Sequence, residues 1–239
     1  MIKYIRLFLQ VAIAVSVYLI LSSFISDIWV LVIFLSVTIL IVLNGNKGKK
    51  SHTYYLDTQC NSEKHLIYVE VKLKNKNESL YILYKTYGEL LNGKTEGFAN
   101  DLNKIDISEL NMKERFLLEE IKLKLIYIDK DIDLYSAKLL EITNADYYIT
   151  LKNELLIIKA PLYLLKEEYT ELVDLMFEII PKQKESYRII ELEYYLCLAY
   201  IAQGKEEDAI AVLEFITKRD FKLDFVTKSR VLLEGLKKN

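Results

Sequence analysis

The stretch that decides the fold lies near the C-terminus and reads EYYLCLAYIAQGKEEDAIAVL over residues 193–213. Apolar residues recur at helical spacing on both sides of Gly204, which predicts two amphipathic helices joined by a tight turn. Gly204 can end the first helix because glycine adopts a positive φ without a steric penalty. Ala209 is small and lets the second helix approach the first closely. The stretch therefore predicts an antiparallel helix pair.

The composition of the whole chain agrees with a helical protein. Its 239 residues are 52% hydrophobic and 28% charged, with only 7 Gly, 2 Pro and 2 Cys. Such an apolar chain is not disordered, and two cysteines do not make a disulfide scaffold. So few Gly and Pro residues leave little material for β-hairpins or phosphate-binding loops. We therefore expect an all-α protein.

A weak internal repeat extends the helix pair towards the N-terminus. Tyr127, Tyr163 and Tyr200 are separated by 36 and 37 residues, and each lies near the end of a helical pattern. A second series of small or apolar residues keeps a similar spacing and comprises Ala99, Ala137, Leu172 and Ala209. Two series in step predict a tandem array of helix pairs.

Residues 193–216 resemble the tetratricopeptide repeat (TPR). That family places a small residue and an aromatic in the first helix, a glycine at the turn and a small residue in the second helix. The matching residues are Cys197, Tyr200, Gly204 and Ala209. Earlier units match at fewer positions, namely Ala160, Tyr163, Tyr169 and Leu172, then Tyr127, Asp131 and Ala137, then Gly93, Phe98 and Ala99. The resemblance implies a TPR-like α-solenoid over residues 51–239.

The expected helices span residues 62–74, 78–92, 95–104, 111–129, 132–143, 147–166, 168–180, 184–203, 205–217 and 221–236. Val69, Val71 and Leu73 alternate like a strand, but their place in the repeat is that of a second helix, so we expect helix there. Pro161 falls inside a first helix, where it favours a kink. The lysine-rich last helix is typical of the polar cap at the open end of a solenoid.

The first 50 residues predict a membrane anchor. Residues 7–43 carry one formal charge, and a single helix of that length would reach about 55 Å across a hydrocarbon core of about 30 Å. A central polar cluster, Ser22, Ser23, Ser26 and Asp27, therefore places a turn between two transmembrane helices, Leu7–Phe24 and Ile28–Leu43. The flanking basic residues are Lys3, Arg6, Lys47, Lys49 and Lys50, and the positive-inside rule puts both ends in the cytoplasm. The alternative, a signal peptide ending near Ser26, lacks a cleavage pattern.

Residues 51–239 are then expected to form a cytoplasmic domain beside the cell membrane. They carry 27 basic and 33 acidic side chains, which are interspersed. An acidic domain of this kind lacks the electrostatic footprint of a nucleic-acid-binding protein. We expect the chain to contact the lipid bilayer through residues 7–43 and to have no nucleic-acid partner.

The sequence contains none of the common catalytic motifs, such as a glycine-rich phosphate loop or a His-Glu-x-x-His helix. Its acidic pairs are adjacent, so their side chains diverge by about 100° on a helix and are expected at helix ends or on solvated faces. These pairs are Glu119–Glu120, Glu167–Glu168 and Glu206–Glu207. Cys60 and His65, with Asp57 and Glu63 nearby, are expected to be surface residues, because a zinc site needs four ligands at tighter spacing. Cys197 is expected in the core. We expect no cofactor, no metal and no enzymatic activity.

The TPR resemblance implies a concave groove lined by the first helix of each pair. The groove-facing positions form an apolar stripe, and the expected partner-binding residues are Leu118, Ile121, Leu125, Ile157, Leu164, Tyr194, Leu198 and Ile201. The stripe lacks the Lys and Asn pattern with which chaperone-binding members hold a terminal carboxylate. We therefore expect a protein partner that offers an apolar or amphipathic helix. The alternative is a tightly wound superhelix that buries the stripe as core.

Together these features predict a membrane-anchored, non-enzymatic adaptor or scaffold that holds a protein partner near the membrane. One alternative is a regulatory or immunity-type membrane protein that acts through its hairpin, where Gln10 and the serines of the spans would matter more than the groove. Another is an enzyme whose site converges from several helices.

Overall fold

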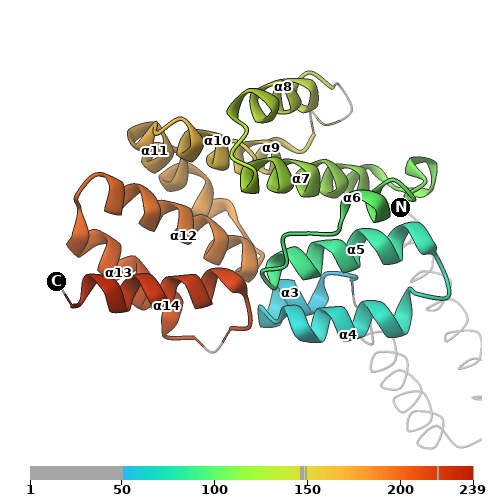
Figure 1. Ribbon diagram of the computed structural model, residues 1–239, viewed down its shortest axis with the longest axis horizontal. Helices are drawn as coiled ribbons and strands as arrows, with labels where there is room; N and C mark the ends of the chain where they lie inside the picture. The colour runs from blue at the N-terminus through green and yellow to red at the C-terminus, as the bar shows by residue number, and fades with distance from the viewer. Residues whose placement is uncertain (1–50, 146–147, 149, 220, 239) are drawn as a thin grey trace, which may run out of the picture. The chain divides into compact units, whose positions relative to one another are not determined.

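A computed structural model describes residues 51–145, 148, 150–219 and 221–238. All regular structure in these residues is helical, apart from one isolated bridge between Asn61 and Lys222, so the expected all-α class is confirmed there. The α-helices in Figure 1 are α3 (Tyr54–Gln59), α4 (Ser62–Lys72), α5 (Glu78–Leu91), α6 (Ala99–Leu102), α7 (Met112–Ile128), α8 (Ile132–Thr143), α9 (Lys152–Ile157), α10 (Ala160–Leu165), α11 (Tyr169–Ile179), α12 (Ser186–Ala202), α13 (Glu206–Thr217) and α14 (Asp224–Leu236). Short 3₁₀ turns lie between α6 and α7, at Ile107–Glu109, and between α11 and α12, at Ile180–Lys182.

The expected transmembrane hairpin within residues 7–43 lies outside the described residues. Within the described part of the chain, no helix has the length and apolar character that crossing a bilayer requires. The basic flanks of the hairpin, including residues 47–50, also lie outside the described part.

The helices repeat with a period of 37 residues. The helices α5, α7, α10 and α12 end at residues 91, 128, 165 and 202, and the partner helices α8, α11 and α13 begin at residues 132, 169 and 206. The residue that turns the chain after each first helix has a left-handed backbone, with φ between 57° and 89°. These residues are Gly93, Lys130, Glu167 and Gly204. The described part of the chain thus contains four structurally equivalent turns.

The four turns share one hydrogen-bond pattern. The backbone N–H of the residue after each left-handed position donates to the carbonyl oxygen five residues earlier, with N···O distances of 2.9 to 3.4 Å. The donor and acceptor pairs are Lys94 and Glu89, Asp131 and Ile126, Glu168 and Tyr163, and Lys205 and Tyr200. This is the Schellman arrangement that satisfies carbonyl groups at a helix C-terminus. It forms at Lys130 and Glu167 as well as at the two glycines, so the repeat is set by more than glycine placement.

Buried side chains keep the same 37-residue register. One series consists of four isoleucines, Ile105, Ile142, Ile179 and Ile216, and all four are buried. A second series lies at the start of the second helices and comprises Phe98, Tyr135, Leu172 and Ala209. The sequence-based register differed from this one, since it used Ala99 and Ala137 in place of Phe98 and Tyr135. Ala137 is exposed, because it lies two residues beyond the helical position that faces the core.

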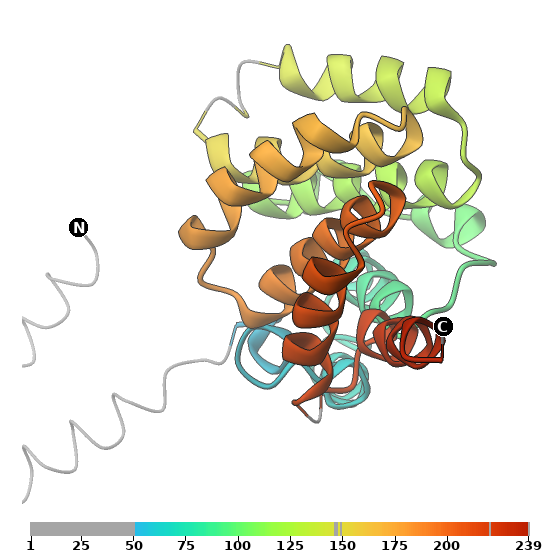
Figure 2. The ribbon, with the colours of Figure 1, turned by 90° about the vertical axis from the view of Figure 1, so that its left-hand side faces the viewer.

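The segment between α3 and α4 contacts the segment just before α14. The backbone N–H of Lys222 donates to the carbonyl oxygen of Cys60 at 2.9 Å, and that of Ser62 donates back to the carbonyl of Lys222 at 3.1 Å. Figures 1 and 2 both show α3 and α4 beside the C-terminal helices. Val226 of α14 is fully buried in the same cluster as Leu56 of α3. The helix 221–236 expected as a polar cap on an open end therefore packs against the first helices instead.

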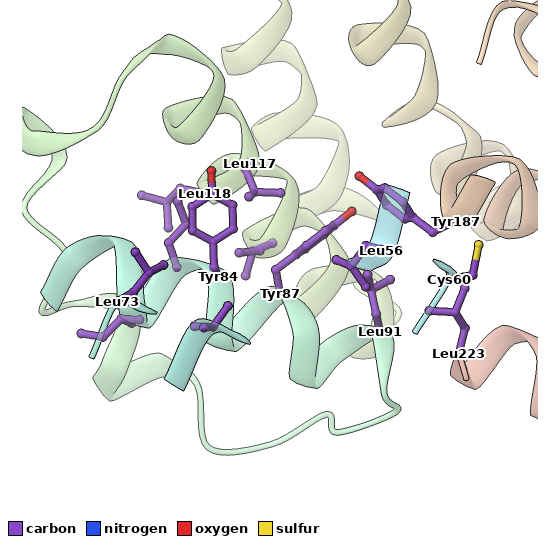
Figure 3. Packing of buried hydrophobic residues seen from close by; sticks show 14 of the residues in the cluster. Leu56, Cys60, Leu73, Tyr84, Tyr87, Leu91, Leu117, Leu118, Tyr187 and Leu223 are labelled. Atoms are coloured by element: carbon purple, nitrogen blue, oxygen red, sulfur yellow. The ribbon is translucent and has the colours of Figure 1, made fainter. Parts of the chain in front are cut away.

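The largest hydrophobic cluster lies where these ends meet (Figure 3). Tyr84 and Tyr87 of α5, Leu117 of α7 and Tyr187 of α12 all contribute to it. The rings of Tyr87 and Tyr187 meet edge to face, with centroids 6.1 Å apart. An aromatic pair of this geometry adds to the stability that burial alone supplies.

Two local expectations need correction. The helix expected over 147–166 is divided into α9 and α10, because Pro161 has no N–H to donate to the carbonyl of Ile157. The backbone between α9 and α10 is held by Tyr135, whose hydroxyl donates to the carbonyl oxygen of Ile158 at 2.7 Å. The helix expected over 95–104 is reduced to α6, and α3 was not expected at all. The helical interpretation is confirmed for Val69 and Val71, while Leu73 is the C-cap residue that follows α4.

Candidate functional site

The apolar stripe expected to bind a partner is partly buried in the domain. Leu118, Ile121 and Ile157 are buried, and the other five members are half-buried. Those five are Leu125, Leu164, Tyr194, Leu198 and Ile201. Leu118, Ile121, Leu125 and Tyr194 belong to one core cluster, which joins helices α7 and α12. In this structure, the stripe contributes mainly to the core.

A buried ion pair links these two helices. The guanidinium of Arg188 on α12 donates from both Nη atoms to the two carboxylate oxygens of Glu120 on α7. The hydroxyl of Tyr87 donates to the same carboxylate at 3.3 Å. The Arg188 guanidinium also lies over the ring of Tyr187, 5.1 Å from its centroid. A bidentate pair with these neighbours fixes the distance and rotation of α7 against α12.

A second ion pair lies one helical turn further along. The ammonium group of Lys124 bonds to the carboxylate of Glu191, and it lies 3.5 Å from Glu120. The hydroxyl of Tyr195 donates to Glu191 at 3.0 Å. We name Glu120, Lys124, Arg188 and Glu191 the interior charge cluster. It contains two acids and two bases, so its formal charges cancel.

The surroundings favour the charged forms of Glu120 and Arg188. Burial opposes the ionisation of Glu120, but the charges of Arg188 and Lys124 outweigh it and hold the pKa of Glu120 below its usual value. Burial also opposes the charge on Arg188, yet Glu120 raises the pKa of that guanidinium. Each charge is therefore stabilised by its partner and would be costly to leave alone.

A pocket of about 350 Å³ opens beside the interior charge cluster. Tyr84, Phe116 and Tyr187 supply aromatic walls, and Glu120 and Arg188 line it. Asp57 of α3 also lines it, and burial raises the pKa of that carboxyl against the opposing hydrogen bond from Thr53. Because Glu120 and Arg188 are already bonded to each other, these two groups have little capacity left to hold a ligand.

Two of the four residues considered for metal binding lie in the core, while Asp57 is half-buried and Glu63 is exposed. Cys60 and His65 are fully buried, so the expectation that they are surface residues is wrong. Nε2 of His65 lies 2.9 Å from the carbonyl oxygen of Tyr84, and burial lowers the pKa of the imidazole. No group of three or more His, Cys, Asp or Glu side chains in the described ranges is arranged to hold a metal ion. Cys197 is buried as expected, and burial raises the pKa of its thiol to about 12.

The acidic pairs divide into two kinds. Glu206 and Glu207 lie in the first turn of α13, as expected for charges at a helix N-terminus. Glu119 and Glu120 are not solvated. Glu120 belongs to the interior charge cluster, and Glu119 bonds to Lys122 and Lys138 at 2.8 and 2.7 Å. Adjacent positions on α7 thus point to two different neighbours, as their angular separation requires.

A different apolar surface is open to solvent on the second helices. We name it the α11–α13 groove. It has a volume of about 350 Å³ and is lined by Met176, Phe177, Ile180, Pro181, Glu193, Leu196, Ala211, Val212 and Phe215. Phe177 and Phe215 are 65% and 42% exposed. An apolar hollow with two exposed phenylalanines is typical of a binding surface.

One carboxyl group faces this apolar lining. Glu193 on α12 is partly buried, and its Oε2 atom is buried with no hydrogen-bond partner. Burial raises the pKa of Glu193 to about 7, although Arg219 acts in the opposite direction. The groove therefore combines apolar walls with one incompletely satisfied acid.

The sequence contained a signal for this groove that an analysis of the first helices misses. Phe177 stands three residues after Asp174, and Phe215 stands seven after Asp208, so each aromatic residue shares a side of its helix with an acidic residue. A large apolar residue beside acidic residues indicates a contact outside the core.

Comparisons with family models, curated proteins and solved structures found no match to this chain.

Proposed function

We propose that this chain is a membrane-anchored, non-enzymatic adaptor whose TPR-like helical domain binds a protein partner at the α11–α13 groove. The observation that carries the proposal is the exposure of Phe177 and Phe215 on either side of an apolar hollow. Burying such side chains against a partner yields about 25 cal/mol for each Å² of apolar area removed from water.

The packing of the interior also favours the α11–α13 groove as the binding surface. Its charged groups pair with one another, and the stripe Leu118, Ile121 and Ile157 is already covered. A partner entering there would have to separate α7 from α12 and break two buried ion pairs. The α11–α13 groove requires no such rearrangement, so it is the favoured surface for a helical segment of a partner.

The membrane anchor in the proposal rests on the sequence of residues 7–43 and on its basic flanks. Two transmembrane helices would confine the domain to the cytoplasmic face of the cell membrane. Confinement raises the effective concentration of the domain towards any membrane-associated partner, so even a modest groove affinity suffices. The TPR-like assignment rests on Cys197, Tyr200, Gly204 and Ala209 and is supported by the 37-residue period.

Site-directed photocrosslinking in intact membranes tests the proposal. A photoreactive side chain is placed at Phe177 or Phe215 and, as a matched control, at Leu140 on α8, which is 60% exposed outside the groove. We expect one protein to crosslink from both groove positions and not from Leu140. The proposal fails if the groove positions give no product or only the products of the control.

An exchange of the anchor distinguishes an adaptor function from a function of the transmembrane hairpin itself. Residues 1–50 are replaced by an unrelated two-span anchor with the same basic flanks. An adaptor should keep its groove crosslink, because the hairpin serves only as a tether. Loss of the crosslink with the new anchor would favour a regulatory protein that acts through its hairpin.

A further inference from the structure

The two second helices that contribute to the α11–α13 groove, α11 and α13, are acidic. Helix α11 contains three acidic residues and α13 contains four, and neither contains a basic residue. These acids are Glu171, Asp174 and Glu178 on α11 and Glu206, Glu207, Asp208 and Glu214 on α13. Glu178 and Glu214 are paired, with Lys182 and Lys237 respectively. Arg219, shortly after α13, is basic, and its guanidinium lies over the ring of Phe215, 4.8 Å from the centroid. The remaining acids of α11 and α13 outnumber it, so their combined field is negative and attracts a basic segment.

Glu193 adds a specific feature to this general field. Its carboxyl group lines the groove among Met176, Leu196 and Val212, and its Oε2 atom is buried without a hydrogen-bond partner. Leaving a buried polar atom unpaired costs free energy, which a ligand recovers when it supplies a donor. A leucine or valine from a partner would fill the hollow but leave this cost in place.

We propose that the helix bound in the α11–α13 groove presents a lysine or arginine side chain to Glu193, between apolar residues that contact Phe177 and Phe215. This inference rests on the proposed function, because it names the chemistry of the partner at the same surface. The methylene stem of the basic side chain contacts the apolar walls while its charged end bonds to the carboxylate. The partner segment is thus a basic amphipathic helix.

The pairing also gives the interaction a pH dependence. Glu193 must be ionised to attract a cation, and in the free protein it is largely protonated below pH 7. Arg219, which follows α13, is the charged residue that acts on Glu193 in the free protein, where it favours ionisation. Glu178 and Glu214, on the helices that flank the groove, are occupied by their lysine partners. Binding of a basic helix should therefore strengthen between pH 6 and pH 8.

A selection from displayed helical peptides tests the inference. The full-length chain is held in nanodiscs of neutral phosphatidylcholine, with empty nanodiscs as the background. The peptides carry apolar residues at positions i, i+4 and i+7, and all intervening positions are randomised. The same library is applied to the native chain, to Glu193→Gln and to the double variant Phe177→Ser with Phe215→Ser. Glu171→Gln, an exposed acid on α11 outside the groove lining, is the matched control.

We expect the native chain and Glu171→Gln to enrich peptides with Lys or Arg at one fixed position, and Glu193→Gln to lose that preference. A selected peptide should bind the native chain about tenfold more tightly than Glu193→Gln at pH 8, as expected for one charge-assisted hydrogen bond. Circular dichroism confirms that each variant is folded.

The alternative outcomes separate the two proposals. Peptides that bind the native chain and not the double phenylalanine variant, yet show no basic preference, would overturn the role of Glu193 and leave the groove as the binding surface. Equal enrichment on the native chain and on the double phenylalanine variant would overturn both proposals.

Discussion

The interior of the domain and the α11–α13 groove differ in how their charged side chains are paired. In the interior, Glu120 and Arg188 are buried and bonded at both ends, so each charge satisfies the other. In the groove, Glu193 lies among apolar side chains with one buried oxygen unpaired. Oε2 of Glu191 in the interior also has no hydrogen-bond partner, but Lys124 bonds to that carboxylate and Arg188 lies 3.7 Å from the oxygen. Paired charges fix how helices pack, whereas a carboxyl group without such a pair, beside exposed aromatic residues, leaves an interaction that a partner can complete. This difference is the basis for proposing the groove as the binding site.

The largest expected effect contrasts one side chain from each region. Ile121→Asp places an unpaired charge at a fully buried position, so we expect it to unfold the domain. Phe177→Asp adds the same charge at a position that is mostly exposed, and we expect its stability to change by about 0.5 kcal/mol or less. Urea unfolding followed by circular dichroism measures both. A folded Ile121→Asp domain would show that the interior is open.

The next effect concerns the bidentate ion pair. Arg188→Met leaves the buried carboxylate of Glu120 without its main partner, and we expect a loss of about 3–5 kcal/mol in the free energy of unfolding. Combining it with Glu120→Leu removes both charges and should restore most of that loss. Arg230→Met, at an exposed position on α14, is the control and should be close to neutral. Equal losses in the single and double variants would argue against a coupled pair.

A smaller loss is expected at the second ion pair. Lys124→Met removes one partner of Glu191, but Tyr195 still donates to that carboxylate and Arg188 lies 3.7 Å from it. We therefore expect a cost of about 1–3 kcal/mol, below that of Arg188→Met. Chemical denaturation of the two variants side by side gives the order, and the reverse order would mean that Lys124 rather than Arg188 holds α7 to α12.

The smallest effect is a gain in stability at the groove. Burial raises the pKa of Glu193 to about 7, above the value of about 4.3 expected in an unfolded chain. The folded state then binds more protons than the unfolded state between these values, so this residue lowers stability as the pH rises from about 4 to 8. Because the side chain is partly solvated, we expect Glu193→Gln to stabilise the domain by only about 1 kcal/mol at pH 8 and by nothing at pH 4.

Thermal unfolding at the two pH values measures this gain, with Glu171→Gln as the control. A gain that is the same at both pH values would arise from something other than the ionisation of Glu193. A loss at pH 8 would show that its carboxylate already has a strong partner within the domain.

The sequence predicted the helical elements of the C-terminal unit well, because local signals define them. Gly204 ends α12 with φ of 69°, and Ala209 is fully buried, as the turn and the small side chain indicated. The repeat spacing was close, but its register slipped at Ala137, where the core position is taken by the larger Tyr135. The four isoleucines at 37-residue spacing mark the register that the structure shows, but the sequence-based prediction did not use them.

The arrangement of the helices depended on contacts that a local pattern does not contain. Glu120 and Arg188 are 68 positions apart, and no sequence pattern near either residue indicates that they pair. The contact of α14 with α3 joins segments separated by most of the domain. For this reason the apolar stripe was expected on an open face, while the structure buries Leu118, Ile121 and Ile157 and leaves the other five members half-buried.

Thiol labelling of the folded full-length chain tests most directly that the interior is closed and the groove is open. The native Cys60 and Cys197 are buried, and burial raises the pKa of each thiol to about 12, so both serve as protected references. We expect Phe177→Cys to react at the rate of an exposed thiol and Leu118→Cys to be protected by about 100-fold or more, as the native cysteines are. Equal rates at positions 118 and 177 would contradict the account.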